Sequence, residues 1–379
     1  MYRLWANDSE ASIRLDRQSA LHVGVVGAGY VSAYHLRTLK TLADIKVVGV
    51  ADLIHERSKS ASTRFGIPGA YNSIEEMLEK GIDVLHVLTP VRSHFELALK
   101  GLEAGSHVFV EKPFVGSIEQ CERLIEEARI RKRRLCVNHS LLGDPTLLKA
   151  LELVRCGAVG NVVSVQILRT GPAPPRPDKR PPYPFDGDPF REVGVHALYQ
   201  LVAILGLIRD ASCMFRSTEQ QPAFKYDEWS VQLDCEKGLA QIHLSWNGPL
   251  QQVMEIRGDK GRSRVDLSSG LLVQRRSWKG PKAIQLALNP VLESVTGVVQ
   301  VVGQAARYMT GKVKAYQGID AMIRRFYRVL LEGGAMPVSH SQVVNVVTWT
   351  ERIASLAEPS GRSPSGSEYR CGAQGQNSS

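Results

Sequence analysis

The sequence predicts an α/β protein with two domains, a doubly wound parallel sheet followed by an α+β domain with an open, mostly antiparallel sheet. Three observations support this. Short apolar runs alternate with helix-like stretches from residue 21 to about 140, whereas strand-like segments follow one another after residue 160. The chain has 379 residues, too many for one ordinary domain, and 43% of them are hydrophobic, enough for sizeable cores.

In the first part of the chain the apolar runs are short and continuous. They occupy residues 23–26, 46–50, 84–88, 107–110 and 135–137, and helix-like stretches lie at 31–43, 54–65, 73–80, 93–104 and 117–131. Alternation of this kind is typical of a parallel sheet with helices on both faces, and continuous apolar runs indicate strands buried on both sides. We therefore expect residues 21–140 to form the first domain, after a flexible segment over 1–20.

After residue 160, turn residues separate most of the strand-like segments. The segments lie at 161–169, 228–236, 239–246, 251–257, 262–267 and 271–276. One helix over 189–205 interrupts them, and a helix over 316–331 and the stretch 340–357 close the fold. The second domain is expected over 141–358. The Ser- and Gly-rich residues 359–379 are expected to be disordered.

A proline-rich stretch, residues 171–188 (GPAPPRPDKRPPYPFDGD), precedes the helix at 189–205. It is predicted to be a loop of stiff extended pieces, because its prolines are incompatible with a helix or a central strand. It carries Arg176, Lys179, Arg180 and Tyr183. These residues either lie on a solvated basic loop or form a lid that neutralises an acidic substrate, for which the planar guanidinium is well suited.

A second unusual stretch is 291–309, where apolar residues recur at steps of four and three: Val291, Val295, Val298, Val302, Ala305 and Met309. That spacing predicts one apolar face on a helix. The face is expected to pack on its own domain. A subunit interface and a contact with a membrane surface are the alternatives.

The charge and the composition narrow the possible partners. A formal net charge of +9 favours an anionic partner, such as a nucleotide cofactor or an acidic substrate, or else only a solvated basic surface. The basic run at 129–134 (RIRKRR) contains no aromatic residue, so specific nucleic-acid binding is not expected. The six cysteines form no C-x-x-C pair and no cluster with histidine, which indicates a reducing compartment and no metal site.

No apolar run reaches the roughly 18 residues of a membrane span, and the first residues lack the apolar core of a secretory leader. We therefore expect a cytoplasmic protein without a transmembrane segment.

The strongest local motif lies at residues 23–35 (VGVVGAGYVSAYH). An apolar strand leads into Gly27 and Gly29, a helix-like run follows, and Ser32 stands where a third glycine would complete G-x-G-x-x-G. Gly27 permits the tight turn, and Gly29 lets the backbone approach a pyrophosphate held at the helix N-terminus. The third glycine serves helix–strand packing, and Ser32 is nearly as small. The motif therefore predicts dinucleotide binding.

A carboxylate stands where this motif requires one. Asp52 follows the second predicted strand and lies 20 residues after Ser32. It can accept hydrogen bonds from both ribose hydroxyls and would repel a 2′-phosphate, so NAD is favoured over NADP. Tyr30 and Val31, which lead from the glycine turn into the helix, are included among the expected cofactor contacts.

Residues 88–114 (LTPVRSHFELALKGLEAGSHVFVEKPF) resemble the signature of the Gfo/Idh/MocA oxidoreductases, and the E-K-P motif is its most specific part. Residues 137–145, 191–201 and 316–339 are similar to further segments of that family, so the resemblance extends from about 21 to 357. It implies a Rossmann domain, a substrate domain built on an open sheet, and a nicotinamide cofactor held between them. It also implies association through the open sheet faces as a homodimer or homotetramer.

The resemblance assigns roles to residues of the first domain. Lys112, whose backbone Pro113 restricts to extended conformations, is the expected catalytic lysine that hydrogen-bonds the substrate oxygen and passes a proton. Glu111 is expected to bond the nicotinamide ribose. The remaining expected cofactor contacts are Thr89, Pro90, His94 and Asn138, although His94 could instead pack at the start of its helix.

A histidine and an acid on the helix at 189–205 complete the expected site. Glu192 lies four residues before His196, so the two share a helical face and the carboxylate can orient the imidazole. The resemblance makes His196 the general base. Glu192 replaces the usual aspartate of the family motif, and Tyr199 replaces a later aspartate, which leaves the substrate open. A histidine that only packs in the core is the alternative.

Together these observations predict an NAD-dependent oxidoreductase that acts on a secondary hydroxyl, or the matching ketone, of a sugar, cyclitol or nucleotide sugar. His196 would remove the hydroxyl proton while Lys112 steadies the developing alkoxide. Two alternatives stay open: a glycoside hydrolase that uses transient oxidation by tightly held NAD, and a non-catalytic NAD-binding regulatory protein.

Overall fold

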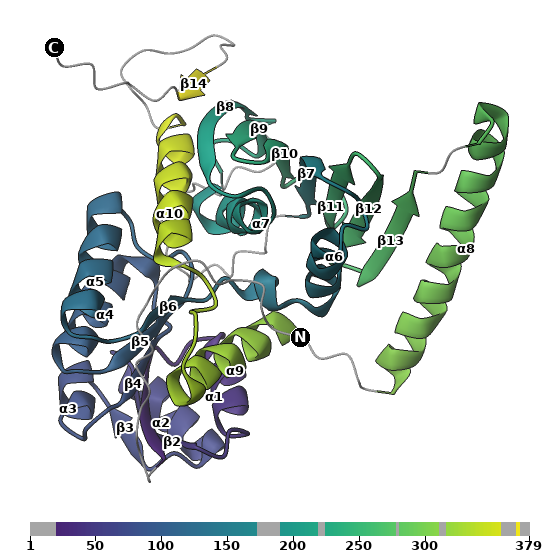
Figure 1. The fold of residues 1–379 in the computed structure, drawn as a ribbon. Helices are drawn as coiled ribbons and strands as arrows, with labels where there is room; N and C mark the ends of the chain where they lie inside the picture. Colours follow the sequence, from purple (N-terminus) through teal and green to yellow (C-terminus); the bar gives the residue numbers. More distant parts are fainter. Residues whose placement is uncertain are drawn as a thin grey trace, which may run out of the picture. The chain divides into compact units, whose positions relative to one another are not determined.

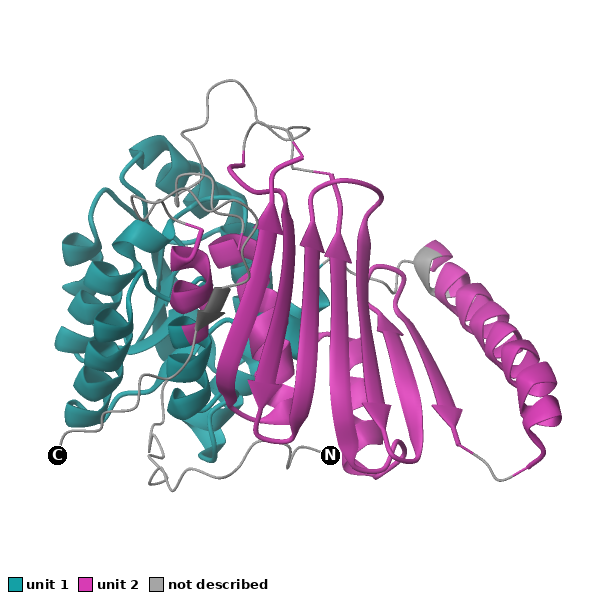
Figure 2. Ribbon diagram, turned by 90° about the horizontal axis from the view of Figure 1, so that it is seen from above, with its two compact units in different colours: residues 1–143, 316–348 teal, residues 144–315, 349–379 magenta. Residues whose placement is uncertain are grey.

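The computed structural model describes residues 20–172, 190–218, 224–277, 280–310, 316–357 and 369–371. The chain forms two compact units, residues 1–143 with 316–348 and residues 144–315 with 349–379 (Figure 2). The first boundary lies close to the expected one at residue 140. Residues 316–348, which we expected in the second domain, group instead with the first unit.

The first unit is built on a parallel sheet with the strand order β3-β2-β1-β4-β5-β6. The strands are β1 (Leu21–Val26), β2 (Ile45–Ala51), β3 (Gly69–Tyr71), β4 (Val84–Val87), β5 (His107–Val110) and β6 (Leu135–Val137). All residues of β4 and β5 are buried, which explains why these strands are apolar except for one histidine each. In a doubly wound sheet of this order, ligands bind outside the carboxyl ends of the strands, where the order reverses between β1 and β4.

Helices cover both faces of this sheet (Figure 1). They are α1 (Ser32–Leu39), α2 (His55–Phe65), α3 (Ile74–Leu78), α4 (His94–Glu103), α5 (Ile118–Ile130) and α9 (Gln317–Glu332). The side chains of Ser73 and Ser117 accept hydrogen bonds from backbone N–H groups and so begin α3 and α5. α9 is held against α1 by a hydrogen bond of 3.0 Å from Thr38 Oγ1 to Asp320.

The second unit is built on an eight-stranded sheet with the order β13-β12-β11-β7-β10-β9-β8-β14. The strands are β7 (Val162–Thr170), β8 (Ile208–Arg216), β9 (Glu228–Cys235), β10 (Gly238–Ser245), β11 (Gln251–Gly258), β12 (Gly261–Asp266), β13 (Leu271–Arg276) and β14 (Tyr369–Cys371). Only the β7–β10 pair is parallel among the neighbours described here. The predicted mostly antiparallel sheet is therefore confirmed.

One face of this sheet carries the core of the second unit. Buried Val231 and Leu233 of β9 alternate with more exposed residues, as do Ala240 and Ile242 of β10. The helices α6 (Pro145–Arg155) and α7 (Val195–Leu205) contact the sheet, and α8 (Lys282–Met309) lies beside β13 (Figures 1 and 2). α10 (His340–Ser355) follows α9 in the chain.

Several elements differ from the sequence-based expectation. β3, α6 and β8 were not expected, although Asp144 and Pro145 are clear start signals: Asp144 accepts hydrogen bonds from two backbone N–H groups of α6, and Pro145 is its first residue. The helix expected at 189–205 begins with a π-helical turn, Phe190–Gly194. Within the tail that we expected to be disordered, β14 pairs with β8. The rest of that tail and the first 19 residues lie outside the described residues.

The helix expected over 291–309 is longer, and its environment differs from the prediction. α8 extends over Lys282–Met309, and Val291, Val295, Val298, Val302 and Met309 are 56–82% exposed, so their face does not pack on its own domain. Within the described residues, Lys282–Ala306 is the one helix long and apolar enough, by length and composition alone, to cross a membrane. We had expected no such segment.

Candidate functional site

The turn after β1 depends on glycine at one position and is open at the other. Gly27 has φ +96°, and a Cβ there would lie 2.7 Å from the carbonyl carbon and 2.8 Å from the oxygen of Leu88. Only glycine therefore lets the end of β1 lie against this backbone. A Cβ at Gly29 would meet no atom within 4 Å. The backbone at Gly29 thus faces open space, as the approach of a pyrophosphate requires.

The start of α1 suits an anion. Ser32, in the place of a third glycine, is buried and donates a hydrogen bond of 2.6 Å to the Gly29 carbonyl oxygen. Val31 stands at the N-cap, and the first turn contains no acidic residue. Tyr30 is 72% exposed beside this turn. The positive end of the helix dipole is thus not neutralised by a first-turn carboxylate.

Asp52, just after β2, is fixed beside the glycine turn. Its Oδ2 accepts a hydrogen bond of 2.8 Å from the backbone N–H of Ala28, and its Oδ1 accepts one of 2.9 Å from that of Ile54. The carboxylate therefore has a defined position next to Gly27 and Gly29. Its contact with a ribose stays a prediction.

The carboxyl end of β5 carries a buried carboxylate. Glu111 Oε1 accepts hydrogen bonds from His35 Nε2 at 2.8 Å and from Asn138 Nδ2 at 2.5 Å. Burial raises the pKa of Glu111, but the hydrogen bonds from His35 and Asn138 and the charge of Lys112 outweigh it, so this pKa lies below its ordinary value. Glu111 is therefore held as a carboxylate with a fixed orientation.

Behind Glu111 lies a chain of buried groups that the sequence analysis missed. His35 Nδ1 lies 3.0 Å from His86 Nδ1, and His86 Nε2 lies 2.9 Å from Tyr327 Oη. One arrangement of protons satisfies every contact: Tyr327 donates to His86, His86 to His35, and His35 to Glu111. Burial, and then the neighbouring His35, hold the pKa of His86 well below its ordinary value. The signal was a histidine inside the apolar strand VLHVL, which must find a partner when buried.

Asn138 and Lys112 stand beside Glu111 in different surroundings. Asn138 is fully buried, and its Oδ1 is without a hydrogen-bond donor among the described residues. Lys112 is half-buried, its backbone N–H donates to Glu111 Oε2 at 3.2 Å, and its peptide bond to Pro113 is cis. A buried acceptor without a donor is unusual in a protein interior and suits a ligand N–H.

His94 is tied to the backbone on both sides of its ring. Its Nδ1 lies 2.9 Å from the Pro113 oxygen and its Nε2 lies 2.6 Å from the Thr89 oxygen. Burial lowers the pKa of His94, against the opposite effect of these carbonyls. The ring thus joins the segment after β4, which contains Thr89 and exposed Pro90, to the segment after β5. Such contacts are expected if His94 packs at the start of its helix, which was the alternative to a contact with the cofactor.

In the second unit, His196 has a tyrosine as a partner. His196, in the first turn of α7, has its Nδ1 2.6 Å from the Oη of buried Tyr199. Glu192 belongs to the preceding π-helical turn, a feature found frequently at functional sites. Arg169 of β7 is half-buried beside Tyr199: burial lowers the pKa of Arg169, and Tyr199 acts against this. Arg169 was not expected from the sequence.

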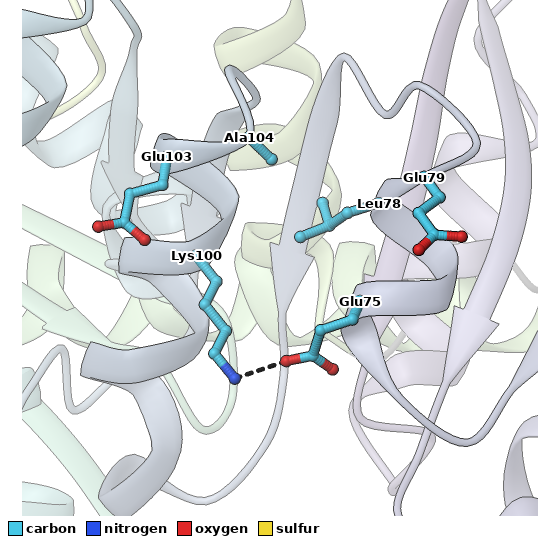
Figure 3. Close-up of a pocket in the computed structure, with 6 residues that line it drawn as sticks. All are labelled: Glu75, Leu78, Glu79, Lys100, Glu103 and Ala104. Atoms are coloured by element: carbon cyan, nitrogen blue, oxygen red, sulfur yellow. Dashed lines mark hydrogen bonds and ion pairs between the residues drawn. The ribbon is translucent and has the colours of Figure 1, made fainter.

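The predicted lid residues Arg176, Arg180 and Tyr183 lie outside the described residues. Elsewhere, a surface hollow lies between α3 and α4, and Lys100 spans it with a contact of 2.5 Å to Glu75 (Figure 3). The hollow contains none of the predicted site residues. Across the described part of the chain, no three His, Cys, Asp or Glu side chains gather into a group that could hold a metal ion.

Comparisons with known proteins agree with this fold. Residues 21–139 match the model of an oxidoreductase family with an NAD-binding Rossmann fold, and residues 147–264 match the GFO/IDH/MocA C-terminal domain. A myo-inositol 2-dehydrogenase of Thermotoga maritima is 28% identical over 156 residues, which cover 41% of this chain and 47% of that relative. The match thus spans about half the length of this curated relative.

Two solved structures show the same fold over nearly their whole length. GenD2 from gentamicin A biosynthesis, in complex with NAD, has a TM-score of 0.72 at 21% identity, with 96% of this chain and 100% of that chain covered. The WlbA dehydrogenase of Bordetella pertussis, in complex with NADH and UDP-GlcNAcA, has a TM-score of 0.71 at 18% identity, with 89% and 97% covered.

Proposed function

The chain belongs to the Gfo/Idh/MocA family of NAD-binding oxidoreductases, and from this premise we propose that it oxidises a secondary hydroxyl of a sugar, cyclitol or nucleotide sugar, or reduces the matching ketone. The observation that carries the proposal is the E-K-P segment. It sets the fixed carboxylate of Glu111 and the half-buried Lys112 at the carboxyl end of β5. Relatives named as inositol and nucleotide-sugar dehydrogenases support this substrate range.

The residues of the first unit fit NAD. The open backbone at Gly29 and the start of α1 would hold the pyrophosphate, and Asp52 would bond the ribose and disfavour a 2′-phosphate. Glu111 would bond the nicotinamide ribose, and Asn138 Oδ1, which has no donor among the described residues, would accept an N–H of the cofactor. Tyr30, Val31, Thr89 and Pro90 would line the cofactor. When bound, NAD supplies the hydride acceptor.

The protein side chains would move the proton. For His196 Nε2 to accept a proton from the substrate hydroxyl, Nδ1 must carry hydrogen and donate it to Tyr199 Oη, which the distance of 2.6 Å permits. Lys112 would donate a hydrogen bond to the substrate oxygen as its negative charge develops. Glu192 would orient His196 from the preceding turn.

The proposal is tested by NADH formation from NAD with a panel of sugars, inositols and nucleotide sugars, run beside Lys112→Met. We expect one substrate class to give a signal that the variant loses by a factor of about 10² or more, while NAD binding is kept. Release of sugar from a glycoside without net NADH would favour the glycosidase alternative. Tight NAD binding without NADH formation from any member of the panel would favour the regulatory protein.

A variant of Arg169 tests whether this residue binds an anionic substrate. A half-buried guanidinium next to Tyr199 is suited to a phosphate or carboxylate of the substrate. If the substrate is a nucleotide sugar or a sugar acid, Arg169→Met raises its KM about tenfold or more. The same KM for an anionic substrate in wild type and variant would show that Arg169 does not bind its charged group. Arg176, Arg180 and Tyr183 are further proposed contacts of an acidic substrate, from their place in the sequence.

We also propose a homodimer or homotetramer formed through the uncovered face of the eight-stranded sheet, and a cytoplasmic location. Leu239 on β10 is 63% exposed, which supports a protein contact on that sheet. Cys121, Cys136, Cys156, Cys213 and Cys235 are free thiols, as a reducing compartment favours. Light scattering coupled to size exclusion measures the subunit number directly.

A further inference from the structure

α8 presents its polar side to the protein and its apolar side outward. Gln285, Asn289, Glu293, Gln300 and Gln304 recur at helical spacing and are buried or half-buried. On the opposite side, Ile284, Val291, Val295, Val298 and Val302 form one stripe and are 46–63% exposed. A surface helix of a globular protein has the reverse arrangement.

The polar side of α8 is occupied by specific contacts with the edge of the sheet. Gln300 Nε2 donates to the Leu272 oxygen at 2.6 Å, and Gln300 Oε1 accepts from the Leu272 N–H at 2.8 Å. The side-chain amide thus satisfies backbone groups of β13, the edge strand. Glu293 accepts a hydrogen bond of 2.8 Å from Arg262 and lies 3.5 Å from Arg275. These contacts fix which side of the helix faces outward.

The outward side has the chemistry of a lipid-facing surface. Between residues 283 and 306 the sequence contains one charged residue, Glu293, and that residue faces the sheet. The outward side therefore has no charged rim, whereas protein interfaces are surrounded by a polar rim. It is also wider than the narrow seam by which two helices pair, because Leu292, Val299 and Val301 flank the stripe and are 52–66% exposed.

The charges near α8 favour an anionic surface. Exposed Arg276 ends β13, Lys282 begins α8, and the chain carries a net charge of +9. Basic residues beside an apolar helical face attract anionic lipids. A helix that crossed the bilayer would take Glu293 and the glutamines into hydrocarbon, which is costly. We propose that α8 binds the surface of an anionic lipid bilayer, with its axis along the membrane and its valine side in the interface.

The test is flotation of the full-length protein with vesicles of phosphatidylcholine alone or with added phosphatidylglycerol. We expect wild type to float with the anionic vesicles, and the double variant Val298→Asp, Val302→Asp to float at least about tenfold less. The control is Ile130→Asp, Leu250→Asp, which changes two apolar residues of similar exposure outside α8 and has the same net charge. The control is expected to float like wild type.

Two results would overturn the proposal. One is wild type that stays unbound with both kinds of vesicle. The other is a wild-type oligomer in light scattering that the α8 variant dissociates while vesicles bind neither protein, because this result assigns the apolar side to a second copy of the chain. Circular dichroism establishes that both variants are folded. Because NADH formation is not read out here, a failure of the enzymatic proposal leaves this test unaffected.

Discussion

At the scale of single residues, Gly27 and Gly29 allow a matched test of the cofactor turn. Gly27→Ala places a methyl group 2.7 Å from the Leu88 backbone at φ +96°, so we expect it to cost about 1–3 kcal/mol of stability as well as NAD affinity. Gly29→Ala meets no protein atom within 4 Å. It should leave the unfolding temperature within about 1 °C but weaken NAD binding about tenfold or more.

Thermal unfolding and calorimetric titration with NAD measure the two effects separately. Unchanged NAD affinity in Gly29→Ala would contradict the placement of the pyrophosphate at this turn. A stable Gly27→Ala protein would show instead that the Leu88 backbone can move away.

The same residues show what a sequence can reveal about a site. The glycine turn and Asp52 are separated by a short, regular spacing, so local motif and chemistry suffice to find them. The contacts of His35 join residues 51 and 76 positions apart, and His86 meets Tyr327 across 241 positions. No local pattern encodes such distances, because they depend on strand order and on where α9 packs. The buried His86 in VLHVL indicated only that a hydrogen-bond partner must exist, not which residue it is.

At the scale of elements, the π-helical turn and α7 present His196 to a tyrosine. If Tyr199 Oη accepts the Nδ1 proton and so keeps Nε2 free, Tyr199→Phe removes the group that fixes this tautomer. We expect kcat to fall about tenfold or more, out of the roughly 10²–10⁴ that a general base contributes, with KM little changed. Steady-state kinetics measures this split, and Tyr226→Phe is the control in the same unit. An unchanged kcat would show that Tyr199 does not orient His196, and Glu192 would then be the one proposed residue left for that role.

Elements also show where periodicity stops being informative. The spacing of Val291, Val295, Val298 and Val302 correctly predicted one helical face, but it carries no information on which side the protein contacts. That side is decided by the partners of the polar stripe, Leu272 and Arg262, on strands earlier in the chain. β8 was missed for a related reason: its sequence, IRDASCMFR, mixes charged and apolar residues, since only one of its sides is buried.

At the scale of the whole molecule, buried histidines make stability depend on pH at values well above those at which carboxylates titrate. Burial lowers the pKa of His139 to about 3 and also lowers those of His86 and His94. Below the pKa of about 6.5 that a histidine has in the unfolded chain, the unfolded chain binds protons that the folded chain does not. The free energy of unfolding therefore decreases as the pH decreases. The stabilisation is complete above about pH 6.5 and is lost as pH falls toward the folded values.

Each such histidine contributes a slope of up to about 1.4 kcal/mol per pH unit within its window. We therefore expect the urea midpoint, followed by far-UV circular dichroism, to fall between pH 7 and pH 5, before the acid-side loss from the lowered pKa values of Glu111 and Asp227 begins. His139→Phe should flatten this fall, and His55→Phe, at an exposed position, should not. A midpoint constant from pH 7 to pH 5 would mean that these rings gain protons without opening the fold, and hence that water reaches the interior of the first unit.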